Sequence, residues 1–219
     1  YLYGGYLYVC NYVTGGTSST ISQITCQDIP FWYSNSNISG LGLTSYDGYI
    51  YAGGSGIIKI SLADPFNNYS TWSAAGSSVW HLTNDGNYLY YADATDSRIG
   101  RISLTNPTTD FSYNFANSGQ GLNGCRGLTL YNGYLYVTNN NANTISKISV
   151  NNPTADYSTS WATITQGLLL PFGIDVYDNY LYVANRGAGT VSKISVTNPT
   201  TDYVASWATS AQGLGDTRG

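Results

Sequence analysis

The sequence predicts an all-β protein in which a four-stranded antiparallel unit is repeated along the whole chain. Three observations support this prediction: a recurring Tyr-aliphatic-Tyr segment, turn residues at fixed places around it, and a composition poor in helix formers. The 219 residues contain no Glu and no Met but 22 Tyr and 25 Gly. Because Tyr, Thr, Ile and Val favour strands whereas Glu and Met favour helices, this composition indicates β-structure.

The first tyrosine of each Tyr-aliphatic-Tyr segment marks the repeat. Successive marks are 43, 39, 46 and 46 residues apart, and the interval counted from the last mark through the chain ends to the first is 45. Since the interval across the termini matches the internal ones, five units close a circle. Four strands per unit, apolar on both sheet faces, predict a five-bladed β-propeller, a single domain of residues 1–219 with adjacent termini. The marks are Tyr6, Tyr49, Tyr88, Tyr134 and Tyr180.

The fourth unit shows how the strands are placed. GLTLY (127–131) reaches the turn Asn132-Gly133, and YLYV (134–137) then alternates Tyr on one face with Leu and Val on the other. Both faces of this strand are apolar, so we expect it to be packed on both sides. After a polar loop, TISKISV (144–150) forms the third strand. An Asn-Pro turn then leads to a last strand with one large aromatic residue.

Two stretches 46 residues apart, YVTNNNANTISKISV (136–150) and YVANRGAGTVSKISV (182–196), carry a family resemblance. The motif YVTN followed by NTISKISV resembles the YVTN-type repeat, a relative of the NHL repeat, of propellers found in microbial surface-layer proteins. The resemblance covers the whole chain, clearly in the last two units and loosely in the first, and in the second unit the loop shrinks to GGSG (53–56). It implies the propeller fold rather than one function, because such propellers host many unrelated activities.

Two columns of residues recur in the last two strands of the units, and we assign both to structure. A large aromatic residue in the last strand is expected to pack between blades rather than stack on a sugar. A cation on the third strand is followed nine residues later by Asp, which predicts a cross-strand pair of small effect where it is exposed. The aromatic column is Trp32, Trp72, Phe115, Trp161 and Trp207, and the pairs are Arg101 with Asp110, Lys147 with Asp156 and Lys193 with Asp202.

Short polar side chains stand five residues after four of the marks. A ring of them could resemble a metal site, but Asn and Asp at strand ends commonly hydrogen-bond the backbone of the next turn, and we adopt that interpretation. With one His and no Glu in the chain, we expect no metal and no cofactor. Cys10 and Cys26 fall out of register on one hairpin, so we expect free thiols. The polar residues are Asn11, Asp93, Asn139 and Asn185.

The basic residues outside the cation column gather on one predicted face. They lie either on loops between second and third strands or at the starts of innermost strands, which surround the central channel of a propeller. Because arginine forks beside an aromatic ring suit a carboxylate, phosphate or sulfated sugar, we predict a ligand site at this channel mouth. In the alternative interpretation, these arginines pair with Asp93, Asp96 and Asp216 as solvated surface. The predicted site comprises Arg98, Arg126, Arg186, Arg218, Trp80, His81 and Phe172.

We therefore expect a non-catalytic binding or scaffold module that presents this loop face to a protein or glycan partner. It would act as a monomer or as part of a surface, extracellular or viral-particle assembly. A carbohydrate-binding, lectin-like propeller with one site per blade is the alternative. The rival class is an enzyme of the lyase or lactonase type, for which only His81 and unpaired Asp residues such as Asp175 offer a base.

Composition argues against two further classes of partner. Eight basic residues and a sequence pI near 4.5 provide little affinity for nucleic acid. No apolar run approaches the ~20 residues of a membrane span, so we expect no membrane insertion. Glycosylation motifs at Asn37 and Asn68 are compatible with an extracellular location, whereas free thiols are equally compatible with the cytoplasm.

Overall fold

The computed structural model describes residues 2–3, 6–11, 19–24, 31–35, 42–64, 67–73, 78–214 and 217, with the backbone alone described before residue 42. The chain divides into two compact units, residues 1–93 with 100–113 and residues 94–99 with 114–219. Cys26, Asp216 and Arg218 lie outside the described residues.

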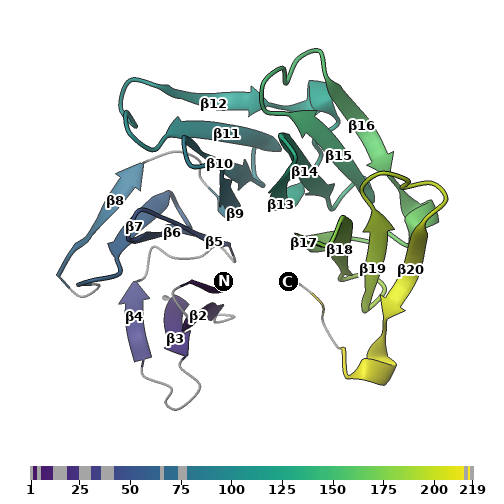
Figure 1. Cartoon of the computed structure of the whole chain (residues 1–219), viewed down its shortest axis with the longest axis horizontal. Helices are drawn as coiled ribbons and strands as arrows, with labels where there is room; N and C mark the ends of the chain where they lie inside the picture. The colour runs from purple at the N-terminus through teal and green to yellow at the C-terminus, as the bar shows by residue number, and fades with distance from the viewer. Residues whose placement is uncertain are drawn as a thin grey trace. The chain divides into compact units, whose positions relative to one another are not determined.

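The first unit is built from antiparallel sheets whose strands follow one another in chain order (Figure 1). One contains β5 (Leu43–Tyr46), β6 (Tyr49–Gly53), β7 (Ile57–Ser61) and β8 (Tyr69–Ser73). The next contains β9 (Val79–Asn84), β10 (Tyr88–Asp93), β11 (Arg98–Ser103) and β12 (Phe111–Ala116), and its last two strands extend into the second unit. The backbone of β1 (Leu2–Tyr3), β2 (Tyr6–Asn11), β3 (Ser19–Ile24) and β4 (Phe31–Asn35) pairs in the same order.

The second unit contains two further sheets of the same order. The first comprises β13 (Cys125–Tyr131), β14 (Tyr134–Asn139), β15 (Thr144–Ser149) and β16 (Tyr157–Ala162), and the second comprises β17 (Pro171–Tyr177), β18 (Tyr180–Asn185), β19 (Thr190–Ser195) and β20 (Tyr203–Ala208). The prediction of an all-β chain made of four-stranded antiparallel sheets is confirmed. Among the described residues, no helix has the length and apolar character needed to cross a membrane.

The hairpin turns and strand registers follow the sequence pattern. Asp47-Gly48 and Asn132-Gly133 have positive φ at both residues, as a tight turn of the I′ type requires. In the first hairpin Asn11 pairs with Thr20 and Cys10 with Ile21, the register that the sequence predicts.

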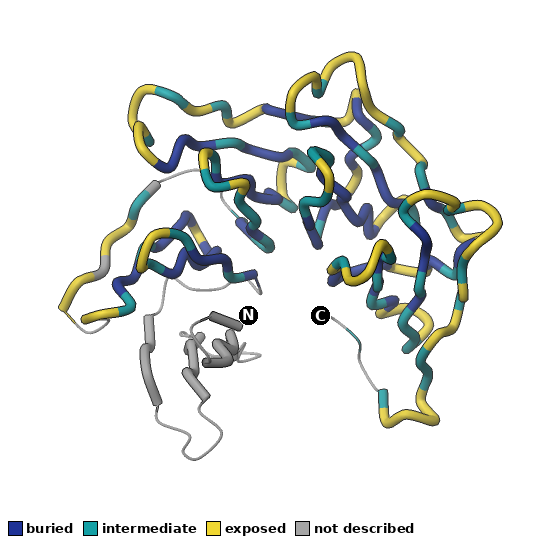
Figure 2. Tube along the Cα trace, viewed as in Figure 1, coloured by how far each residue is buried: buried dark blue, intermediate teal, exposed yellow. Residues whose placement is uncertain are grey.

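The second strands β6, β10 and β14 are buried on both faces, whereas one face of β18 is only partly buried. In β14, Leu135 and Val137 are fully buried on one face and Tyr136 is 1% exposed on the other. Tyr136 and Ile145 of one sheet share a core with Leu181 and other residues of the next sheet. Figure 2 shows burial running along the middle strands and exposure along the loops. Two neighbouring sheets of the second unit therefore pack face to face over one apolar layer.

A buried hydroxyl joins the two sheets of the second unit where their backbones come closest. A Cβ added to Gly127 would lie 2.3 Å from the carbonyl oxygen of Phe172, so only glycine fits between these strands. The Gly127 N–H donates to Thr138 Oγ1 at 2.7 Å, and that hydroxyl donates to the Phe172 carbonyl at 2.7 Å. Thr138 thus connects its own sheet to the next one through a single fully buried atom.

Short 3₁₀ turns after the last strands add contacts that the sequence interpretation did not include. The turn η2 (Ile164–Gln166) begins at Thr163, and the Thr163 N–H donates to Gln166 Oε1 at 2.9 Å in a capping box. It ends at Gly167, whose φ is +84° and whose added Cβ would lie 2.4 Å from the Ala205 carbonyl oxygen in β20. The turns η1 (Ser118–Gln120) and η3 (Ser210–Gln212) are capped in the same way.

The aromatic column contributes to packing both within and between sheets. The indole of Trp161 meets the ring of Tyr136 from its own sheet edge-on, with ring centroids 5.0 Å apart, and also packs against the core shared with the next sheet. Trp72 does the same with Tyr51 in the first unit. The predicted packing role is confirmed for these two residues. Trp207 makes the same contact with Tyr182, yet its side chain is 53% exposed.

The column of cations and acids is linked through a tyrosine rather than only by direct pairing. Lys147 Nζ lies 4.0 Å from the ring centroid of Tyr134, whose hydroxyl donates to Asp156 Oδ2 at 2.8 Å. That hydrogen bond raises the pKa of Tyr134. Lys193, Tyr180 and Asp202 repeat the arrangement.

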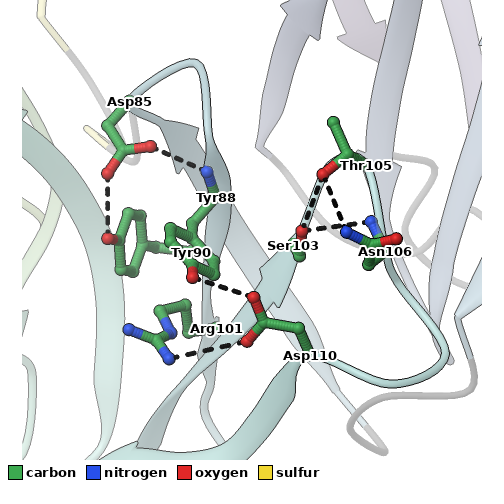
Figure 3. A network of polar contacts seen from close by, with 8 residues as sticks. All are labelled: Asp85, Tyr88, Tyr90, Arg101, Ser103, Thr105, Asn106 and Asp110. Atoms are coloured by element: carbon green, nitrogen blue, oxygen red, sulfur yellow. Dashed lines mark hydrogen bonds and ion pairs between the residues drawn. The ribbon is translucent and has the colours of Figure 1, made fainter.

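A direct ion pair accompanies the tyrosine link in the first unit, where Arg101 and Asp110 approach to 3.8 Å. Figure 3 shows the Arg101 guanidinium beside Tyr88, whose hydroxyl donates to Asp110. The mark tyrosine therefore explains the nine-residue spacing, since one aromatic ring holds both the cation and the acid.

We expect Thr138→Val to lower the free energy of unfolding by about 1–3 kcal/mol, because it leaves a buried N–H and a buried carbonyl without their shared hydroxyl. Urea denaturation measures the change, and Thr138→Ser, which keeps the hydroxyl, is the matched control. A valine variant as stable as the parent would contradict the role given to this atom.

Alkaline pH should weaken the fold through its buried tyrosines. Burial raises the pKa of both Tyr51 and Tyr136 to about 12, whereas an unfolded tyrosine ionises near 10. Their contribution is fully present below about pH 10 and is lost as the pH rises towards 12, by up to about 1.4 kcal/mol per pH unit for each group.

Urea midpoints measured between about pH 9 and 12, below and above the ordinary tyrosine pKa, check this expectation. Tyr136→Phe should make the fall in stability shallower, and Tyr177→Phe, at a side chain 75% exposed, is the surface control. Equal slopes in the parent and the Tyr136→Phe variant would show that the buried phenol is not responsible.

Candidate functional site

Arg126 owes its position to a β-bulge at the start of β13. Cys125 pairs with Asn139 and Leu128 with Val137, so Arg126 and Gly127 together face the single residue Thr138. A bulge interrupts side-chain alternation and redirects the extra residue. Beneath it, Cys125 is fully buried and its thiol donates to the Arg98 carbonyl at 3.4 Å.

The same irregularity recurs at the equivalent residues of other sheets. In β17 the shift falls between Pro171 and Ile174 and so includes Phe172, and in β9 it falls between Val79 and His81 and so includes Trp80. Trp80, Arg126 and Phe172 each stand eight residues before a mark tyrosine, and the strand register matches this equivalence. Each of these predicted site residues occupies the bulge of a first strand.

The guanidinium of Arg126 lies beside an aromatic ring and near a second cation. Its Cζ is 5.7 Å from the ring centroid of Phe172, which is 6% exposed. Burial lowers the pKa of Arg126, the nearby Cys125 raises it, and the positive charge of Arg186 lowers it. An arginine remains charged at neutral pH despite such shifts, so the second unit carries two like charges within electrostatic reach.

The other predicted residues do not all belong to this group. Arg98 forms an ion pair with Asp96 at 2.8 Å, in agreement with the alternative interpretation of this arginine as paired surface. Trp80 and His81 lie on β9 in the first unit, where the Trp80 indole donates to Ser78 Oγ at 2.7 Å. Arg218 lies outside the described residues. The second unit thus brings together Arg126, Phe172 and Arg186.

The buried asparagines at the ends of β14 and β18 are structural. Asn139 accepts from the Asn123 N–H and donates to Ser146 Oγ at 2.9 Å. Asn185 accepts from the Leu169 N–H and donates to Ser192 Oγ at 2.8 Å. Both side chains are fully buried, and the expectation that such residues hydrogen-bond the next turn is confirmed for Asn139 and Asn185.

Two exposed leucines beside Arg186 were missed in the sequence. Leu169 and Leu170 are 39% and 38% exposed, and Leu170 has a φ of +47°. The Arg186 N–H donates to the Leu170 carbonyl at 3.3 Å. Alignment of the last two sequence repeats would identify them, because an Asn-Gly pair of the preceding repeat becomes Leu-Leu here.

The two groups considered for catalysis lie on different strands. Asp175 is exposed on β17, and its Oδ1 accepts from the Val176 N–H at 2.8 Å. His81 is on β9 of the other unit. Within the described part of the chain, no group of three or more His, Cys, Asp or Glu residues could hold a metal ion.

No protein-family model matches the sequence, and no curated protein is similar to it in sequence. Solved structures do match. A periplasmic gluconolactonase of Pseudomonas aeruginosa is 16% identical, with a TM-score of 0.65 over 99% of this chain and 69% of that one. A catalytically inactive virginiamycin B lyase of Staphylococcus aureus with quinupristin is 17% identical, with a TM-score of 0.61 over 91% and 69%. A chain of the nidogen/laminin complex is 14% identical, with a TM-score of 0.57 over 90% and 92%.

These likenesses, together with the repeated four-stranded sheets, show a β-propeller fold. At identities of 14% to 17% they show the fold alone. The YVTN or NHL character of the repeat stays a prediction from the sequence.

The prediction that the chain is not an enzyme is wrong as an inference from the sequence. Two of the solved structures with this fold are a gluconolactonase and a lyase, so the fold is compatible with catalysis. The sequence disfavours catalysis because it contains one His and no Glu. Scarcity of these residues does not decide the matter, because activity in a propeller depends on a few groups placed by its loops.

Proposed function

We propose that the chain is a binding module of the β-propeller class that takes an anionic ligand beside Arg126 and Arg186. The single observation that carries this proposal is the placement of Arg126. A bulge directs its guanidinium to the Phe172 ring, and Arg186 adds a second positive charge nearby. Two neighbouring guanidinium groups repel one another, and an anion between them would relieve that repulsion while accepting their N–H groups.

The proposal keeps the sequence-based site residues that the second unit brings together, namely Arg126, Phe172 and Arg186. Trp80, His81, Arg98 and Arg218 remain predictions from the sequence. A carboxylate, a phosphate or a sulfated sugar has the chemistry that this group recognises.

We propose further that the repeats close as five YVTN- or NHL-like blades in one domain, with the chain ends adjacent. The last sheet of the second unit supports closure because its two edge strands, β17 and β20, expose large aromatic side chains. Tyr177 is 75% exposed and Trp207 is 53% exposed, whereas their counterparts Tyr131 and Trp161 pack against the core shared with the next sheet. The count of five repeats predicts that another sheet of the same chain covers this face.

The setting that fits such a module is an extracellular, cell-surface or virion-associated assembly, with a protein or glycan as partner. A related fold in the nidogen/laminin complex supports a protein partner by analogy of fold only. The low charge and the many Tyr, Asn, Ser and Thr residues suit a surface that makes neutral hydrogen bonds.

A lectin-like propeller is the second candidate, and exposed aromatic rings on the last strands favour it. Phe111 and Tyr113 on β12 are 41% and 45% exposed with ring centroids 4.7 Å apart, and Tyr157 on β16 is 40% exposed. Rings repeated in this way could stack on sugars, with one weak site per blade. The two candidates differ in stoichiometry, since the arginine group predicts one site per chain.

We expect Arg126→Ala to weaken binding of an anionic probe by about tenfold or more, because a charge-assisted arginine contact is lost. Isothermal titration calorimetry with inorganic sulfate and a sulfated disaccharide measures affinity and stoichiometry. Lys147→Ala is the matched control, because this lysine lies over Tyr134 in the structural column and its removal should leave binding unchanged.

Unchanged affinity in the Arg126→Ala variant would contradict the proposed site. Several equivalent sites per chain, unaffected by Arg126→Ala, would favour the lectin-like candidate.

A further inference from the structure

The last two sequence repeats of the chain each contain the same turn, so the two turns can be compared directly. In the earlier turn the Asn141 and Asn140 N–H groups donate to the Asn123 and Gly124 carbonyls, and Asn139 accepts from the Asn123 N–H. Every one of these hydrogen bonds recurs 46 residues later in the turn at Leu169 and Leu170. The two turns therefore share one backbone design.

The side chains on this shared turn differ in a consistent direction. Asn123 and Gly124 become Leu169 and Leu170, and Asn140, which is 9% exposed, becomes the exposed Arg186. Asn140 donates to the Pro171 carbonyl, whereas the position of Arg186 faces solvent. Two asparagines and a glycine of one repeat are thus replaced by two exposed apolar residues and a cation in the next.

The backbone gives no reason for a leucine at residue 170. Its φ of +47° lies in the left-handed region, where Gly124 in the earlier turn has a φ of +65°. A leucine side chain is strained in this conformation and glycine is not. The turn nevertheless keeps Leu170, fixed by its N–H donating to Asn143 Oδ1 at 2.7 Å. Strain of this kind at an exposed position points to a functional use of the side chain.

The two leucines adjoin the charged group already described. Leu170 is two residues before Phe172, and its carbonyl accepts from the Arg186 N–H. Leu169 fits against Gly187, where an added Cβ would lie 2.8 Å from Leu169 Cγ. Arg186 is in turn close enough to Arg126 to lower its pKa. An apolar pair and a cationic pair thus stand side by side within one unit.

We propose that this surface binds an amphiphilic anion, with its acidic head group at Arg126 and Arg186 and its aliphatic tail over Leu169 and Leu170. The proposal rests on the anion site of the proposed function and adds the class of ligand. The positive charges of Arg126 and Arg186 are complementary to an anionic head group. The net charge of the chain is −4, so these two cations make this surface an exception. The exposed leucines select the tail, because covering them removes apolar surface from water.

Calorimetry with three probes separates head from tail: methyl sulfate, octyl sulfate below its micelle concentration, and 1-octanol. Octyl sulfate should bind the parent chain at least about tenfold more tightly than methyl sulfate, and octanol should bind more weakly than octyl sulfate. Replacing the two leucines with the residues of the earlier turn, L169N/L170G, should reduce octyl sulfate binding to the level of methyl sulfate. Methyl sulfate binding should not change.

The double substitution is expected to fold, because the same Asn-Gly pair already occupies this turn in the preceding sequence repeat. Its near-ultraviolet circular dichroism and melting temperature provide the check, and Leu169→Asn alone is the second variant should the double one unfold. Equal binding of octyl sulfate by the parent and these variants would overturn the tail subsite and leave the anion site standing. Failure of both sulfates to bind the parent chain would overturn the anion site as well.

Discussion

Each sheet whose side chains are described carries apolar residues on both faces, so such a sheet can be stable only between two neighbours. The constraint originates in the Tyr-aliphatic-Tyr strand, which buries Leu135 and Val137 on one side and Tyr136 on the other. Neither face can be left to water without losing the free energy of apolar burial. Repetition of the unit follows from this, because each sheet supplies the cover that the preceding one requires.

Close packing of neighbouring sheets also determines where the candidate site lies. The backbones approach so closely at Gly127 that a side chain is excluded, and the Thr138 hydroxyl satisfies the N–H and carbonyl groups buried there. The bulge that accommodates this contact leaves Arg126 as the extra residue. The contact of Arg126 with Phe172 is therefore a consequence of how the two sheets pack. The proposed anion site depends on this packing.

Much of the fold could be predicted from the sequence because its signals are local and repeated. The tight turn at Asn132-Gly133 and the burial on both faces of YLYV follow from residue type alone. The equivalence of Trp80, Arg126 and Phe172 came from counting, and the strand registers agree with it. The tyrosine between Lys147 and Asp156 was not foreseen, because spacing reveals that two residues are near but not which ring lies between them.

The candidate site was harder to predict, for physical reasons that particular residues illustrate. Arg98 and Arg126 look alike in the sequence, yet Arg98 pairs with Asp96 while Arg126 lies against Phe172. Leu169 and Leu170 do not stand out in the sequence because leucine is common, and only the left-handed backbone of the turn makes Leu170 unusual. Composition disfavours catalysis, yet solved structures with the same fold include a gluconolactonase and a lyase.

One crystal structure, of the whole chain in bromide-containing solution, would test most directly whether sheet packing both closes the fold and builds the site. Anomalous scattering would locate bound bromide without assumption about the ligand. We expect five blades, with Tyr177 and Trp207 covered by another sheet of the chain, and a bromide peak between the guanidinium groups of Arg126 and Arg186. A different number of blades, or bromide bound elsewhere with these two arginines directed apart, would contradict this expectation.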